Sequence, residues 1–196
     1  IKGDFAGRPV NKIVDDAKRL AETGVKELIV IAQDTTFYGA DFKNDHSLAT
    51  VLTELNAIDG IEWLRLMYTH PAHWTDDILE SLLTLDKLVP YFDVPIQHIS
   101  DPILERMGRR VSRTRIEQLI AGIRAKIPNV ALRTSIITGF PGETDVHFQE
   151  FLEFLQEIRF ERLGAFTYSH EEGTRAYKYD DDVPEEVKLE RQRQIM

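Results

Sequence analysis

The sequence predicts an α/β fold built on a parallel sheet. Short, strongly apolar segments alternate along the chain with longer segments whose apolar residues recur every three or four positions. The first pattern is typical of buried parallel strands, and the second of helices that cover a sheet. Polar residues gather directly after each apolar segment, which is where ligands bind in parallel α/β folds. We therefore expect one ligand site at the carboxyl ends of the strands.

The first half of the chain contains three predicted helix–strand pairs. The alternation predicts helices at 11–23, 47–58 and 75–85, and strands at 27–32, 63–68 and 91–96. Gly24 and Gly60 follow the first two helices, as expected where a helix ends. Thr75 is the expected N-cap of the third helix.

The second half continues the same alternation. It predicts helices at 102–107, 113–126 and 145–158, strands at 131–137 and 162–168, and a last helix that Pro184 opens. The acidic segment 177–183 is expected to be an exposed connection. Five strands separated by helices imply right-handed crossovers and a parallel sheet. Periodicity alone does not distinguish an open sheet from a closed or partial barrel.

Composition limits the classes of function. The 196 residues suit one domain, with 42% hydrophobic and 29% charged residues, and no apolar run approaches the roughly 18 residues of a membrane span. The start of the chain has no apolar segment of a signal peptide. Lys and Arg total 24 against 33 Asp and Glu, a net charge of −9 that argues against direct nucleic-acid binding by this segment. Without cysteines, these residues can form neither disulfides nor thiolate metal sites.

Two polar segments after strands are candidate binding sites. The turn 138–144, Thr-Gly-Phe-Pro-Gly-Glu-Thr, lets backbone N–H groups approach a ligand at a helix N-terminus, although a plain tight turn, which is common between a strand and a helix, also explains it. Its glycine spacing fits neither a P-loop nor a Rossmann fingerprint. Gln33-Asp34-Thr35-Thr36 could bind an amino-acid head group, or could form only an Asx or Ser/Thr turn.

Histidines and charged clusters allow further alternatives. His70 and His73 would need a third ligand, such as His98 or His170, to bind zinc. Gln97 and His98 at a strand end are placed to hydrogen-bond a ribose or a substrate. The basic cluster, Arg109, Arg110, Arg113 and Arg115, could hold a carboxylate or a partner, or be solvated. At Glu171-Glu172 we expect at most one functional carboxylate.

In order, several motifs resemble the RimO branch of the methylthiotransferase family. They are Ile31-Ala32-Gln33-Asp34-Thr35-Thr36 with Tyr38-Gly39, Val94 to Asp101, Arg106 to Arg110, Arg133 to Thr144, and Phe166 to Thr174. The related tRNA-modifying enzymes typically read Gly-Gln-Asn-Val-Asn in the first of these motifs. The resemblance covers nearly the whole chain.

This resemblance implies a partial (β/α)6 TIM-like barrel of the radical S-adenosylmethionine (SAM) type, spanning 1–196. It implies a 4Fe–4S cluster held by three cysteines that cleaves SAM to a 5′-deoxyadenosyl radical. It further implies a cytoplasmic transferase that uses a sulfur donor to methylthiolate an aspartate of small-subunit ribosomal protein twelve. Ile1-Lys2-Gly3 resembles the residues just after the cysteine loop. The first strand, that loop, and the N-terminal and TRAM domains are therefore expected to lie outside these residues, which alone should be inactive.

The resemblance also implies a cofactor-binding set. Gln33, Asp34, Thr35 and Thr36 would contact the methionine part of SAM, Gln97 and His98 the ribose, and Ile137, Gly139 and Phe140 the adenine, while Phe166 and Tyr168 would close the site and Arg133 would belong to the same set. No catalytic or metal-ligating residue is expected within the chain.

Three other functions remain open from the sequence. The first is a tRNA methylthiotransferase of the same family. The second is a cluster-free barrel that binds a small molecule or a protein. The third is a metal-dependent hydrolase that uses His70, His73 and His98.

Overall fold

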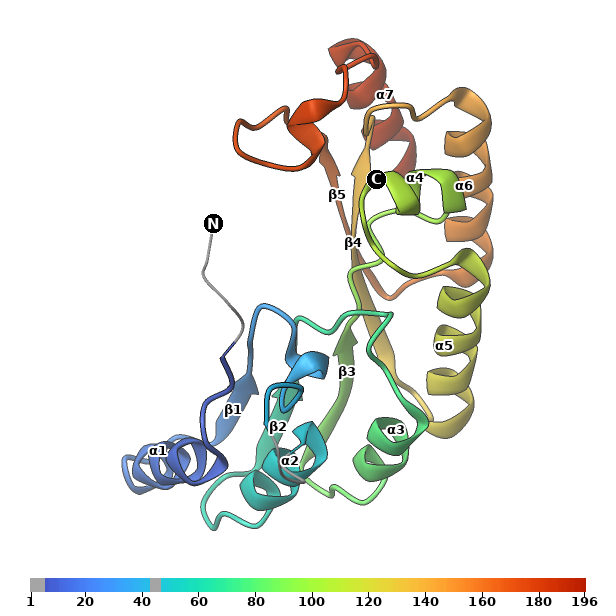
Figure 1. Cartoon of the computed structure of the whole chain (residues 1–196). Coiled ribbons are helices and arrows are strands. Elements are labelled where there is room, and N and C mark those ends of the chain that lie inside the picture. The colour runs from blue at the N-terminus through green and yellow to red at the C-terminus, as the bar shows by residue number, and fades with distance from the viewer. Residues whose placement is uncertain (1–5, 43–46) are drawn as a thin grey trace. The chain divides into compact units, whose positions relative to one another are not determined.

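The computed structural model describes residues 6–42 and 47–196 (Figure 1). Contacts divide the chain into two compact units. The first unit comprises Ile1–Asp93 and Ile123–Val130, and the second comprises Val94–Gly122 and Ala131–Met196. The segment Ile1-Lys2-Gly3, on which part of the resemblance rests, lies outside the described residues.

The first unit contains a parallel three-stranded sheet with helices packed on it. Its elements are α1 (Val10–Glu22), β1 (Glu27–Val30), the 3-10 helix η1 (Thr35–Phe37), α2 (Leu48–Asn56), β2 (Trp63–Leu66), α3 (Asp76–Leu82) and β3 (Leu88–Asp93). Leu28 is paired with Leu64, and Leu64 in turn with Leu88. Buried aliphatic residues of α1 and α2, including Val14 and Val51, pack against this sheet.

The helix ends in this unit follow the local sequence. Thr75 caps α3 as predicted, because its hydroxyl accepts a hydrogen bond from Ile78 N at 3.2 Å. Ser47 caps α2 in the same way through Thr50 N. Gly24, after α1, has φ +90°, a conformation that glycine adopts at little cost.

The second unit contains the remaining strands and helices. Its elements are α4 (Asp101–Arg106), α5 (Arg113–Lys126, whose residues from Ile123 belong to the first unit), β4 (Ala131–Thr138), α6 (Asp145–Ile158), β5 (Arg162–Thr167), η2 (Ala176–Lys178) and α7 (Glu185–Ile195). Strands β4 and β5 are parallel in register from Arg133↔Arg162 to Thr138↔Thr167. Three phenylalanines of α6 are buried: Phe148, Phe151 and Phe154.

The predicted bounds of β3 are wrong by three residues at each end, whereas the other four strands begin where predicted and end within two residues of the prediction. Strand β3 covers Leu88–Asp93 and not 91–96. It begins earlier because the chain already pairs at Lys87, whose carbonyl accepts a hydrogen bond from Leu64 N at 2.8 Å. Pro95 has no N–H to donate to a ladder, so regular pairing stops before it.

The parallel α/β class is confirmed. Each of the two units has its strands parallel and joined through helices. Within the ranges that the structure describes, no helix is long and apolar enough to cross a bilayer.

Candidate functional site

A cavity of about 390 Å³ lies in the second unit at the carboxyl ends of β4 and β5. Its walls combine aromatic, aliphatic and polar side chains. They come from Gln97, Ser135, Ile137, Phe140, Phe166, Thr167, Tyr168, Ser169, Glu171, Thr174 and Ala176. Five of these residues belong to the predicted cofactor-binding set, so the structure brings Gln97, Ile137, Phe140, Phe166 and Tyr168 together around one cavity.

The alternation of β4 explains which of its residues reach the cavity. Arg133, Ser135 and Ile137 are partly exposed on one face of the strand, while the residues between them are buried on the other. Ser135 and Ile137 line the cavity, and Arg133 precedes them on the same face. The sequence analysis missed Ser135, although the period of two along a strand would have predicted it from its neighbours.

Gln97 is held at the cavity by an unusual backbone conformation. Its φ is +69°, which is rare for a residue other than glycine. Its N–H donates to Ser135 O at 3.0 Å, and its carbonyl accepts from Ile137 N at 2.8 Å. Such strained residues cost of order 1–3 kcal/mol and cluster at functional sites. The two hydrogen bonds to β4 fix this conformation beside Ile137.

The predicted glycine-rich turn contributes one aromatic wall. Phe140 is buried and packs edge-on against Tyr168, with ring centroids 5.1 Å apart. Gly139 has φ +72°, and a Cβ placed on it would lie 2.2 Å from Lys188 Cγ. Gly139 is therefore required for close packing on α7, and its vacant side faces Lys188.

Tyr168 remains neutral over the ordinary pH range. Burial, followed by the nearby carboxylates of Asp181 and Glu171, raises the pKa of its phenol. Its hydroxyl lies 3.2 Å from His170 Nδ1. A neutral phenol can donate a hydrogen bond as well as accept one.

His98 does not line this cavity. Its ring is fully buried, stacks near Phe151 at 4.3 Å between centroids, and accepts a hydrogen bond at Nδ1 from Ser100 N. Its Nε2 lies 3.2 Å from Glu143 Oε2. Glu143 in turn accepts hydrogen bonds from Gly139 N and from Arg191. Through Glu143, His98 thus supports the turn that carries Phe140.

In the first unit, the segment after β1 forms a compact polar turn. Asp34 caps η1 by accepting from Phe37 N at 3.2 Å, and it also accepts from the Thr36 hydroxyl at 2.6 Å. Thr35 is buried and donates to Met67 O. Gln33 is exposed. The Asx turn weighed as an alternative is therefore present, and it leaves Gln33 accessible.

Two histidines lie beside Asp34. Ligand atoms of Asp34, His70 and His73 are within 4.8 Å of one another, with His73 Nδ1 2.5 Å from Asp34 Oδ2. Nδ1 of His70 accepts from Ala72 N, so its neutral form carries the proton on Nε2, which then has no lone pair for a metal. Among the described residues, no three-ligand group includes His98 or His170. These contacts give no support to the hydrolase alternative.

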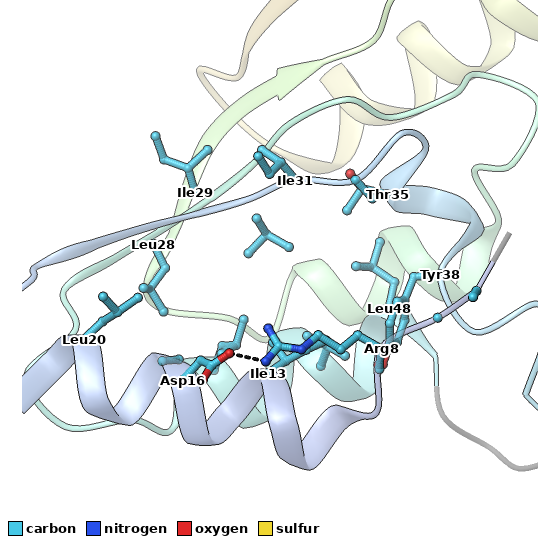
Figure 2. A pocket seen from close by; sticks show the side chains of 17 residues that line it. Arg8, Ile13, Asp16, Leu20, Leu28, Ile29, Ile31, Thr35, Tyr38 and Leu48 are labelled. Carbon is cyan, nitrogen blue, oxygen red and sulfur yellow. Dashed lines mark hydrogen bonds and ion pairs between the residues drawn. The ribbon is translucent and has the colours of Figure 1, made fainter. Parts of the chain in front are cut away.

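A second cavity of about 390 Å³ lies in the first unit against α1, β1 and α2 (Figure 2). Aliphatic side chains, including Leu20, Leu28 and Ile31, dominate its walls. Its charged groups, Arg8 and Asp16, are paired with each other. This lining favours contact with an apolar molecular surface over binding of a charged cofactor.

The site residues fit one of the two expected cofactors. Aromatic and aliphatic walls with a few polar groups, as in the cavity of the second unit, suit a planar nucleoside. A 4Fe–4S cluster needs cysteine thiolates, and the chain contains none. These 196 residues therefore do not fit the cluster.

Comparison with curated proteins gives matches along the entire chain. It is 47% identical to the ribosomal protein uS12 methylthiotransferase RimO of Geotalea uraniireducens and 48% identical to that of Lachnoclostridium phytofermentans, over all 196 residues and 44% of each relative. The resemblance to the RimO branch is thereby confirmed. The chain spans less than half the length of these relatives.

Solved structures support the fold. Coproporphyrinogen III oxidase (HemN) from Escherichia coli, a radical SAM enzyme, matches 95% of the chain and 43% of its own with a TM-score of 0.65 at 18% identity. SuiB from Streptococcus suis, solved with the precursor peptide SuiA, matches 87% of the chain and 35% of its own with a TM-score of 0.59 at 15% identity. These likenesses confirm the expected partial TIM-like barrel.

The family comparison covers most of the chain and four of the residues that line the cavity. The Radical SAM superfamily model matches residues 2–155, which include Gln97, Ser135, Ile137 and Phe140 of the cavity. The chain therefore belongs to the radical SAM superfamily.

Proposed function

We propose that this chain is the central part of an enzyme that methylthiolates the β-carbon of an aspartate in ribosomal protein uS12. Its relatives at 46–48% identity over the whole chain are named ribosomal protein uS12 methylthiotransferase RimO. The observation that carries the proposal is the cavity at the ends of β4 and β5, because five residues assigned to SAM binding by the family motifs line it. The family uses SAM and a 4Fe–4S cluster, which together supply the radical.

The residues of this chain would bind and orient the cofactor. Phe140 and Tyr168, edge to face, offer apolar surface to the adenine, next to Ile137 and the exposed ring of Phe166. Gln97, fixed by β4, offers an amide that can hydrogen-bond the ribose.

The other members of the predicted set would act around this cavity. We propose that the segment Gln33 to Thr36 binds the methionine part of SAM. Arg133 precedes the cavity on its face of β4, while His98 and Gly139 would act by positioning the turn that carries Phe140.

The proposal extends to domain, partners and location. Residues 1–196 would form one partial radical SAM barrel domain of a longer cytoplasmic protein. Its substrate would be uS12, a separate sulfur donor would supply the second sulfur, and this segment would not bind nucleic acid directly. The net charge of −9 favours a protein substrate over a polyanion.

Assays of the full-length enzyme test the function. We expect mass spectrometry to show methylthiolation of uS12 and none of tRNA. Methylthiolation of tRNA alone would overturn the proposal in favour of the tRNA-modifying branch.

A cavity variant tests the site. Replacing Phe166 by Ala removes an apolar wall, so we expect the KM for SAM to rise about tenfold. The matched control is Val146→Ala in the full-length enzyme, since Val146 is exposed on α6 and lies outside the cavity. Equal KM values for the two variants would remove this cavity from the proposal.

A further inference from the structure

Lys188 is a buried cation on α7. Only 3% of the residue is exposed, although lysine is almost always found at the surface of a protein. Helix α7 contacts both β4 and β5, the strands whose carboxyl ends form the cofactor cavity. Taking an ammonium group out of water is costly unless it is paired, so the contacts of this side chain must offset that cost.

The ammonium is paired with the acidic connection that leads into α7. Its Nζ donates to both carboxylate oxygens of Asp181 at 2.8 Å, and Glu185 Oε2 lies 3.8 Å away. Replacing a buried ion pair by uncharged residues of similar volume is often neutral for stability. Stability alone therefore does not require a lysine at this position, since a methionine would fill the same space.

The aliphatic stem of Lys188 supports the turn that carries Phe140. A Cβ on Gly139 would lie 2.2 Å from Lys188 Cγ, so the stem occupies the space that a side chain at position 139 would need. The Thr138 hydroxyl donates to Lys188 O at 3.2 Å, which ties the same point of α7 to the end of β4. The stem and the backbone of Lys188 thus fix the start of this turn against α7.

The ammonium also contacts the second aromatic wall of the cavity. Its Nζ lies 5.3 Å from the ring centroid of Tyr168, within the range of a cation–π interaction. Tyr168 lines the cofactor cavity, and Lys188 is not among the residues that line it. The cation therefore contacts the ring without taking a place in the cavity.

The hydroxyl of Tyr168 has a weaker restraint than its ring. It lies 3.2 Å from Nδ1 of His170, an exposed residue. Because water competes for an exposed hydrogen bond, this contact restrains the side chain less than a buried ammonium does. The position of the Tyr168 ring then depends on Lys188 and on its edge-on packing against Phe140.

We propose that Lys188 is a positioning residue for SAM. Its ammonium, neutralised by Asp181, holds the Tyr168 ring, and its stem holds the turn of Phe140, so that both aromatic walls are in place before SAM binds. Such preorganisation raises affinity because less conformational freedom is lost on binding. The inference rests on the proposed function for the statement that SAM occupies this cavity.

SAM binding to the 196-residue chain tests this role without enzyme turnover. The double variant Lys188→Met/Asp181→Asn removes both charges of the pair, keeps an aliphatic stem and leaves the net charge unchanged. We expect calorimetry to show SAM binding about fivefold weaker, because the Tyr168 ring loses its cation. The urea midpoint should stay close to that of the unchanged chain, because no buried charge is left unpaired.

The matched control is Arg193→Met/Glu190→Gln on the same helix. Arg193 Nη1 lies 2.9 Å from Glu190 Oε2, but both side chains are exposed and neither lines the cofactor cavity. This variant should bind SAM within about twofold of the unchanged chain, because exposed ion pairs contribute little. Equal losses in the two double variants, or a loss that comes with a lowered urea midpoint, would overturn the proposal.

A double-mutant cycle tests whether Lys188 acts through Tyr168. In a Tyr168→Leu background, Lys188→Met/Asp181→Asn should cause no further loss of SAM affinity, because the ring that Lys188 positions is gone. Additive losses would contradict the proposal. Lys188→Arg keeps a cation for both partners and should bind SAM within about twofold of the unchanged chain. A folded Lys188→Arg chain that binds as weakly as the neutral variant would show that the cation does not position the ring.

The full-length enzyme separates this inference from the proposed function. In Lys188→Met/Asp181→Asn, we expect the KM for SAM to rise about fivefold while kcat at saturating SAM stays within about twofold. If Phe166→Ala weakens SAM binding and the Lys188 variant does not, the inference fails and the proposed function stands. If the enzyme modifies no uS12 while the Lys188 variant still weakens SAM binding, the function fails and the positioning role remains.

Discussion

Glu143 is the residue on which the turn around Phe140 depends. Its side chain is fully buried, and one oxygen accepts from Gly139 N at 3.0 Å and from Arg191 at 2.7 Å. The other oxygen lies 3.2 Å from His98 Nε2. A buried carboxylate is tolerated only with such partners, so the three groups depend on one another.

Replacing Glu143 by Gln should therefore destabilise the chain. The substitution keeps the shape of the side chain but leaves the buried guanidinium of Arg191 with only the exposed Asp145 as a counter-charge. We expect a loss of about 3 kcal/mol, which urea denaturation would show as a lower midpoint.

The control for this change is Glu153→Gln on the exposed face of α6. Glu153 accepts a hydrogen bond from Gln149 at the surface, so its loss should stay within about 0.5 kcal/mol. Equal midpoints for the two variants would show that Glu143 does not hold the turn.

Elements with strong local signals could be predicted from the sequence. Helices α5 and α6 have the predicted bounds, 113–126 and 145–158. Strand β3 was misplaced because its start is set by pairing with β2, a contact between distant segments. Strand ends and motifs located Ile137 and Phe166, whereas the contact of Glu143 with Arg191 joins residues 48 positions apart and leaves no local trace.

The packing of α7 on the turn after β4 leads to a prediction for Gly139. An alanine there would meet Lys188 at 2.2 Å and would also have to adopt φ +72°. We expect Gly139→Ala to cost well over the roughly 1–2 kcal/mol of left-handed strain alone, and to speed amide hydrogen exchange in α7.

Gly24→Ala provides the matched comparison. Gly24 has φ +90°, but a Cβ there would have nothing within 4 Å, so only the backbone penalty remains. Similar losses in both variants, with α7 still protected from exchange, would mean that Lys188 moves aside without cost.

At the scale of the whole molecule, the chain has residues suited to one of the two cofactors of its superfamily and lacks the ligands of the other. The cavity of the second unit offers walls suited to a nucleoside, whereas the sequence offers no thiolate for a cluster. In the full-length enzyme the cluster would supply a further anchor for SAM that these residues lack. The 196 residues should therefore retain only the protein's own share of the affinity for SAM.

Anaerobic reconstitution of the 196-residue chain with iron and sulfide should consequently leave it without a cluster. We expect no retained iron and no visible absorption band after desalting, since no cysteine is present to ligate iron. Calorimetry should show SAM binding at least about tenfold weaker than in the reconstituted full-length enzyme, a difference of about 1.4 kcal/mol. The full-length enzyme, treated in parallel, should retain iron and serves as the positive control. Retention of about four irons by the shorter chain, or equally tight SAM binding, would mean that other side chains replace the thiolates. Asp34 and His73, 2.5 Å apart in the first unit, would then be the first residues to substitute.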